Sequence, residues 1–175
     1  MKKQISILKF EIISTIFILI LGFILHFTYE WSGNNPIVGI FSAVNESVWE
    51  HLKLLFFPML ITGVIGSLYY KEAIPNYLCV KTKGILLGLV FIVVFFYTYT
   101  GILGTNLAFL DIGSFLVAVL LGEYYTYYLI NSFDSCNKQL GIIVLLVLSL
   151  LFVLFTFFAP SLGIFTVPVS CFLAI

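Results

Sequence analysis

The sequence predicts an all-α fold, a polytopic transmembrane helix bundle with about five spans and an interfacial or re-entrant outer segment. Hydrophobic residues make up 62% of the chain and charged residues only 9%, whereas a soluble domain has about a quarter of its residues charged. The mean hydropathy is +1.18, and five apolar runs are long enough to cross a bilayer. We expect residues 1–175 to form a single integral membrane domain.

Each expected span contains about 20 apolar residues, the length that a helix needs to cross the hydrocarbon core. The spans cover residues 10–29, 51–70, 84–103, 107–130 and 140–158. The first run is too long for a signal-peptide core and no small-residue cleavage motif follows it, so we interpret it as an uncleaved anchor. Only Gly104, Thr105 and Asn106 separate the third and fourth spans, which predicts an adjacent, antiparallel helix pair.

Two apolar segments do not fit simple spans. Residues 36–44 would form a helix of only about 13 Å, so they are expected to lie in the outer interface or to dip in and return. The tail, residues 159–175, is interrupted by Pro160, Gly163 and Pro168. We expect it to fold back over the outer face.

The lysine positions predict the orientation in the membrane. Lysines precede the first span, lie between the second and third, and lie between the fourth and fifth: Lys2, Lys3, Lys9, Lys71, Lys81, Lys83 and Lys138; only Lys53 falls elsewhere. The positive-inside rule then places the N-terminus in the cytoplasm and the C-terminus outside. Abundant Ile, Lys, Phe, Tyr and Asn with no Arg is typical of an AT-rich bacterial genome, so we expect a bacterial inner membrane.

Charge and cysteine content argue against several classes of function. Eight Lys balance eight acidic residues and Arg is absent, which leaves no basic surface for nucleic acid. Serine hydrolase, Walker-type and dinucleotide motifs are also absent. Cys79, Cys136 and Cys171 match no metal-ligand spacing, and two of them fall in connections that we place in the cytosol. Because thiols stay reduced there, we expect no disulfide.

Ionisable residues within a membrane are functional candidates by default, because they are costly to keep there. Three spans bring such residues to the outer leaflet, and the candidate ligand-binding residues are His26, Glu30, Asn45, Glu46, Glu50, His51 and Asp111. Asp111 is the most demanding of them, since an unpaired carboxylate at membrane depth costs at least about 2.5 kcal/mol. It requires a partner, a proton or an ion.

Structural roles for the same residues stay open. Asn45 is a suitable N-cap that would place Glu46 in the first turn of a helix, where the helix dipole favours negative charge. Glu50 and Lys53 are three residues apart and can neutralise one another. Glu30 can act as part of an interfacial anchor.

Carboxylate and imidazole groups together suit a divalent metal ion such as zinc or manganese. The ligands of such an ion would be His26, Glu50 and His51, although their spacing matches no strict metal motif. Glu123 opens a tyrosine-rich run at the other membrane face, about 18 Å from Asp111 along the helix, so these two acids cannot share a site. We interpret that run as an interfacial anchor.

Small residues follow one face of the fourth span at intervals of four, at Ser114, Ala118 and Gly122, and Gly84 and Gly88 repeat this spacing in the third span. Such stripes let helix backbones approach closely in lipid. The stripe on the fourth span is a candidate surface for a partner helix or for homo-oligomer formation.

Residues 26–60 resemble an uncharacterised family of small bacterial multi-pass membrane proteins, domain of unknown function 6512. The resemblance is carried by His26, Tyr29, Trp31, Ser32, Gly33, Asn45, Glu46, Ser47, Trp49, Glu50, His51 and Lys53. It implies a fold and a membrane location but no activity. It also implies a proline-rich tail with a His and an Asp, where this chain has Ser161 and Val167, so a site completed by those residues would be altered here.

The leading functional hypothesis is an outward-facing carboxylate and histidine pocket, covered by residues 31–44, that binds a cation, a proton or a small polar or lipid headgroup. Two alternatives are an accessory or structural subunit that packs against a partner helix, and a small membrane-embedded metalloenzyme. A transporter is less well supported, because five spans do not divide into equal inverted halves. The sequence does not decide whether the protein is an enzyme.

Overall fold

The computed structural model describes residues 2–132 and 136–168, and every regular element in this part of the chain is helical. Five helices are long and apolar enough to cross a membrane, which confirms the predicted fold class. They are α1 (Lys2–Trp31), α3 (Val48–Tyr69), α4 (Tyr77–Leu103), α5 (Ala108–Asn131) and α6 (Lys138–Phe157).

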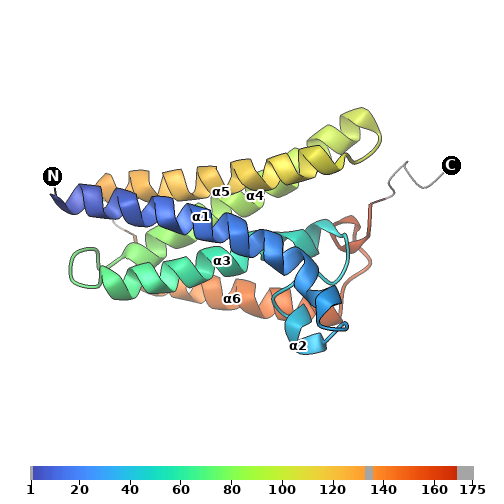
Figure 1. Ribbon diagram of the computed structural model, residues 1–175, viewed down its shortest axis with the longest axis horizontal. Helices are drawn as coiled ribbons and strands as arrows, with labels where there is room; N and C mark the ends of the chain where they lie inside the picture. The colour runs from blue at the N-terminus through green and yellow to red at the C-terminus, as the bar shows by residue number, and fades with distance from the viewer. Residues whose placement is uncertain (1, 133–135, 169–175) are drawn as a thin grey trace.

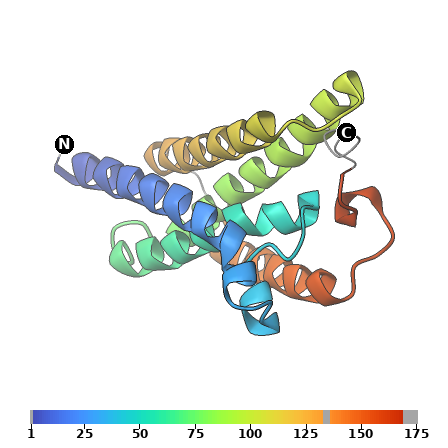
Figure 2. The ribbon, with the colours of Figure 1, turned by 45° about the vertical axis from the view of Figure 1, so that its right-hand side comes forward.

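The five long helices run along the long axis of the molecule, so successive connections alternate between its two ends (Figure 1). We call them the His26 end, where α1 finishes and α3 begins, and the Lys81 end, where α3 finishes and α4 begins. The short helix α2 (Pro36–Gly39) and the 3-10 helix η1 (Gly163–Phe165) both lie at the His26 end (Figures 1 and 2).

Residues 36–44 and the tail were not expected to cross the membrane. Residues 36–44 and the described part of the tail, 159–168, both fold against the His26 end. In the first, the hydroxyl of Ser42, just after α2, accepts a hydrogen bond from the backbone N–H of Tyr29 at 3.0 Å and thereby holds the loop on α1. In the tail, the ring of Phe165 packs 4.9 Å from the ring of Trp49 and 5.2 Å from that of Phe155. The described part of the tail, up to residue 168, therefore folds back over α3 and α6.

Two helix starts differ from the sequence-based expectation. α3 begins at Val48 with Ser47 as its N-cap, so the interpretation of Asn45 as the cap is wrong and Glu46 precedes the helix. α4 begins at Tyr77, which places Lys81 on a helix rather than in a connection. The second difference has a physical reason. Lys81 lowers the local hydropathy, but its charge is paired inside the bundle, so it does not end the helix.

The small-residue stripe on α5 packs against α4 of the same chain. A Cβ atom placed on Gly122 would lie 2.8 Å from the carbonyl oxygen of Gly84, and one placed on Gly88 would lie 3.2 Å from the carbonyl oxygen of Ala118. Ser114, Ala118 and Gly122 are all buried. The predicted antiparallel pair is thus present, but the stripe does not offer the exposed surface that a partner helix or a second copy would need.

Helix α3 occupies the centre of the bundle, and Leu55, Phe56 and Met59 on it are fully buried. Pro58 lies within this helix. It has no N–H to donate to the carbonyl of Leu54, one turn earlier. That carbonyl oxygen instead faces Gly22 of α1, where an added Cβ would lie only 2.7 Å from it. A glycine on α1 therefore lets the two backbones meet where α3 lacks a hydrogen bond.

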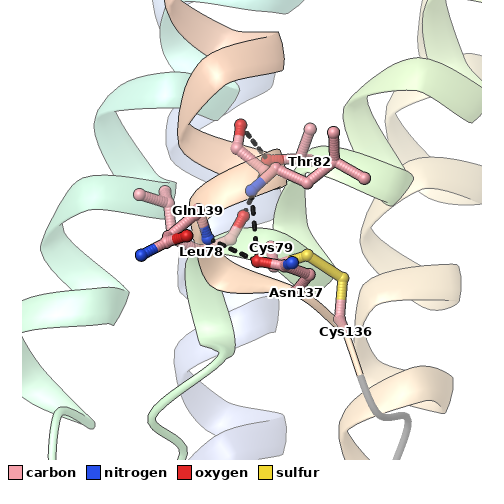
Figure 3. The surroundings of a disulfide bond; sticks show 8 residues. Leu78, Cys79, Thr82, Cys136, Asn137 and Gln139 are labelled. Carbon is pink, nitrogen blue, oxygen red and sulfur yellow. Dashed lines mark hydrogen bonds between the residues drawn. A yellow bond between two sulfur atoms is a disulfide. The ribbon is translucent and has the colours of Figure 1, made fainter.

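A disulfide joins Cys79 on α4 to Cys136 just before α6, with Cα atoms 5.9 Å apart (Figure 3). The expectation of no disulfide is therefore wrong. Sequence spacing could not show this pair, because it forms only when α4 and α6 pack side by side. Gly141 permits that approach, since a Cβ placed there would lie 2.7 Å from the Cα atom of Cys79. Cys171 lies outside the described residues.

Candidate functional site

Three side chains from three elements meet at the His26 end: His26 near the end of α1, Glu46 in the loop before α3, and His51 in the first turns of α3. One potential metal-ligand atom from each lies within 4.8 Å of the other two. Nε2 of His26 is 3.9 Å from Oε1 of Glu46, and Nε2 of His51 is 3.4 Å from Oε2 of Glu46. We call this group the His–Glu–His cluster.

Hydrogen bonding around His51 determines which nitrogen faces the cluster. Its Nδ1 lies 2.9 Å from the backbone carbonyl oxygen of Ser47, an acceptor only, so Nδ1 carries the proton. In neutral imidazole, Nε2 then presents a lone pair toward the carboxylate of Glu46. Two lone pairs that face each other require a cation between them, which is either a proton on Nε2 or a metal ion.

His26 presents Nε2 to Glu46. Its other ring nitrogen, Nδ1, is buried and has no hydrogen-bond partner in the described part of the chain, although buried polar atoms are normally satisfied. Its ring centroid lies 5.2 Å from that of His51. Two imidazoles this close are poorly compatible with both being protonated, because their charges would repel.

Glu46 is the most exposed member of the cluster. Its side chain is 66% exposed, and it stands on a loop residue rather than on a helix. When His51 is protonated, its hydrogen bond holds the pKa of Glu46 below the ordinary value of a glutamate. The carboxylate is therefore charged near neutral pH and can reach either imidazole.

Glu50 belongs to a different network. Its Oε2 lies 2.5 Å from Nζ of Lys53 and accepts a hydrogen bond from the backbone N–H of Val44 at 2.9 Å. Lys53 also donates to the carbonyl of Gly39 at 2.8 Å and to Oγ1 of Thr156 at 2.9 Å. The structure thus brings Glu46, rather than Glu50, to the two imidazoles, and it satisfies the charge of Glu50 with a lysine.

The remaining predicted site residues lie around the cluster without entering it. Asp111 accepts a hydrogen bond from the hydroxyl of Tyr99. The side chain of Asn45 accepts from the backbone N–H of Ser47 at 2.9 Å and so shapes the loop that carries Glu46. Glu30 is exposed at the end of α1.

Sequence reasoning missed a second polar network, at the Lys81 end. Nζ of Lys81 lies 2.6 Å from both carboxylate oxygens of Glu123 and 3.3 Å from Oε2 of Glu11. The hydroxyl of Tyr77 donates to Oε1 of Glu11 at 2.7 Å. Glu11 was the available signal, because it is an acid inside the first predicted span. Glu123 lies in this network, far from Asp111, so the expectation that the two acids do not share a site is confirmed.

An apolar hollow of about 320 Å³ lies between α3, α4 and α6. Its wall includes Trp49, Leu89, Val93 and Leu148, and none of its lining side chains is charged. It offers no charged ligand to an ion.

Comparison with known proteins assigns the family. The chain matches the family of unknown function DUF6512 over residues 1–173. No curated protein and no solved structure matches it. The match covers nearly the whole chain, and we conclude that this multi-pass membrane protein belongs to family DUF6512, whose function is unknown.

Proposed function

We propose that this protein binds a divalent transition-metal ion of the zinc class at the His–Glu–His cluster. The observation that carries the proposal is the orientation of His51: its Nδ1 is engaged by the carbonyl of Ser47, so its Nε2 lone pair faces a carboxylate 3.4 Å away. In metal sites, a backbone carbonyl commonly accepts the other N–H of a ligating histidine and so fixes its tautomer.

The distances suit this ion after a small movement. Zinc ligands at about 2.1 Å from a tetrahedral ion lie about 3.4 Å from one another, and His51 and Glu46 are already 3.4 Å apart. His26 must approach Glu46 more closely than its present 3.9 Å. Because the exposed Glu46 side chain stands on a loop, it can move toward His26 at little cost.

Three protein ligands leave a fourth position of a tetrahedral zinc ion for water or a substrate. This arrangement favours the metalloenzyme alternative over the accessory-subunit alternative, which depended on the small-residue stripe now found against α4. The partly exposed cluster is accessible from the His26 end, as a site for an ion or a small polar ligand must be.

Metal binding is tested directly with purified protein in detergent. We expect zinc to bind with a stoichiometry of one per chain in titration calorimetry. We expect His51→Ala to weaken binding by at least about 100-fold, since even changes to residues that only orient a ligand cost about 10- to 100-fold. Zinc at about 100 times its dissociation constant should stabilise the wild type by about 2.7 kcal/mol.

The matched control is Glu30→Gln, which removes an exposed acid near His26 but no ligand of the cluster. It should bind zinc like the wild type, whereas Glu46→Gln should bind weakly. Equal zinc binding by the wild type, His51→Ala and Glu46→Gln would show that the ion is held elsewhere, and the proposal would then be abandoned.

We further propose that the chain lies in a bacterial cytoplasmic membrane with its N-terminus in the cytoplasm and the His26 end outside. The lysine distribution supports this orientation. The disulfide between Cys79 and Cys136 is evidence against it, because it lies at the Lys81 end and disulfides are rare in the cytosol. We give the lysines more weight, since all of them apart from Lys53 and Lys81, which are buried in ion pairs, lie toward the Lys81 end in the sequence.

Orientation is measured by labelling engineered cysteines in intact cells with a membrane-impermeant maleimide. Native cysteines with free thiols would also react with the maleimide, so the background should carry Cys79→Ser, Cys136→Ser and Cys171→Ser. The engineered cysteine is then the one thiol that can be labelled. We expect Asn34→Cys in this background to be labelled and Ser132→Cys to be protected until the cells are opened. The opposite pattern would place the His–Glu–His cluster in the cytosol.

A further inference from the structure

The network at the Lys81 end brings together charges that do not cancel. Glu11 of α1, Lys81 of α4 and Glu123 of α5 meet with side chains that are 4%, 0% and 4% exposed. If all three groups were ionised, two carboxylates would share one ammonium group, and the network would carry a net charge of −1.

The other side chains found in this network, within the part of the chain that the structure describes, are phenols. The hydroxyl of Tyr77 donates to Glu11, and the ring of Tyr70, at the end of α3, lies 5.9 Å from that of Tyr77. Both are phenols, which are neutral near pH 7. No described cation other than Lys81 forms an ion pair with either carboxylate.

A buried, uncompensated charge is costly in any protein interior and more so within a membrane. The network must therefore hold one further positive charge. The position between the two carboxylates is already filled by Nζ of Lys81, at 2.6 Å from Glu123 and 3.3 Å from Glu11. A metal ion placed there would be repelled by the ammonium group. The cation that needs no additional space is a proton.

We propose that Glu11 and Glu123 form a proton-binding site in which one of the two carboxylates carries a proton while Lys81 neutralises the other. Two carboxylates in one site commonly share a proton in this way, because they cannot both ionise at low cost. The site is separate from the His–Glu–His cluster and uses none of its residues.

The surrounding helices are shaped around this site. A Cβ placed on Gly63 would lie 3.0 Å from Cγ of Lys81, and one placed on Gly66 would lie 2.3 Å from the ring of Tyr77. These two glycines of α3 leave space for the lysine stem and for the phenol ring. The network is therefore part of the packing of α1, α3, α4 and α5 rather than a surface ion pair.

Infrared spectroscopy of the reconstituted protein tests the proposal, because a protonated carboxyl has a C=O stretching band that an ionised carboxylate lacks. Near neutral pH we expect the wild type to show this band, with a downshift in heavy water. We expect Glu11→Gln and Glu123→Gln each to lose it, since each leaves one carboxylate paired with Lys81. Lys81→Gln should strengthen the band, because both carboxyls would then need a proton.

The control is Glu72→Gln, which changes an exposed acid in the connection before α4 and should leave the band unchanged. Loss of folding in Lys81→Gln would not affect the test, because the two glutamine variants decide it. A wild type without the band, or a band that persists in both glutamine variants, would overturn the proposal. A band that appears only when sodium is replaced by choline would instead assign the site to a metal cation.

Discussion

Glu50→Gln is expected to lower the free energy of unfolding in mixed micelles by about 3 to 5 kcal/mol, because it leaves the ammonium group of Lys53 buried without a counter-charge. The side chain of Lys53 is 0% exposed and that of Glu50 is 3% exposed. Lys53 retains its bonds to Gly39 and Thr156, but neither partner is charged. The measurement is chemical unfolding followed by circular dichroism.

Glu46→Gln is the matched control, since it makes the same chemical change four residues earlier on a side chain that is 66% exposed. It should cost under about 1 kcal/mol, as exposed ion pairs do. The double variant Glu50→Gln, Lys53→Met removes both charges and should recover much of the lost stability. Equal, small effects of the two single changes would contradict the importance of the buried pair.

Gly84→Leu is expected to destabilise the bundle by at least about 3 kcal/mol, at the upper end of the range for overpacked cores. An added Cβ would lie 2.3 Å from Oγ1 of Thr126 and 2.4 Å from the carbonyl oxygen of Gly122. The second of these is backbone, which no side-chain rotation can move aside. Helices α4 and α5 must therefore separate, and a lower melting temperature in detergent should report this.

Gly101→Leu provides the control on the same helix. A Cβ at position 101 would meet nothing within 4 Å, so the added side chain enters open space. This variant should melt close to the wild type. If it lost as much stability as Gly84→Leu, the effect would come from the larger side chain itself and not from the close approach of the two helices.

The five helices could be predicted from hydropathy because the bilayer imposes a simple rule: a segment without access to water must satisfy its own backbone hydrogen bonds. The antiparallel contact of α4 and α5 followed from the short turn at residues 104–106. The ends of the helices were harder to predict. Lys81 and Glu11 lower the local hydropathy, although the two side chains pair with each other inside the bundle. Lys81 also pairs with Glu123 on α5. A hydropathy profile contains no information about which distant residues form such pairs.

The composition of the His–Glu–His cluster could be predicted only in part. His26 and His51 stood out as histidines at one membrane face, but adjacent residues on a helix point about 100° apart. Glu50 and His51 therefore cannot easily face the same ligand. Glu46 takes that place because Ser47 caps α3 and leaves Glu46 in a loop, where its direction is set by contacts that the sequence does not display.

Pro58 has a mechanical consequence for the molecule. It divides α3 into a half that carries His51, Glu50 and Lys53 and a half whose glycines border Lys81 and Tyr77. Bending a helix at a missing hydrogen bond costs less than bending it elsewhere. Any tilt of one half relative to the other is therefore concentrated at Pro58, against Gly22 of α1, so that a movement at one end of α3 is absorbed there and need not disturb the packing at the other.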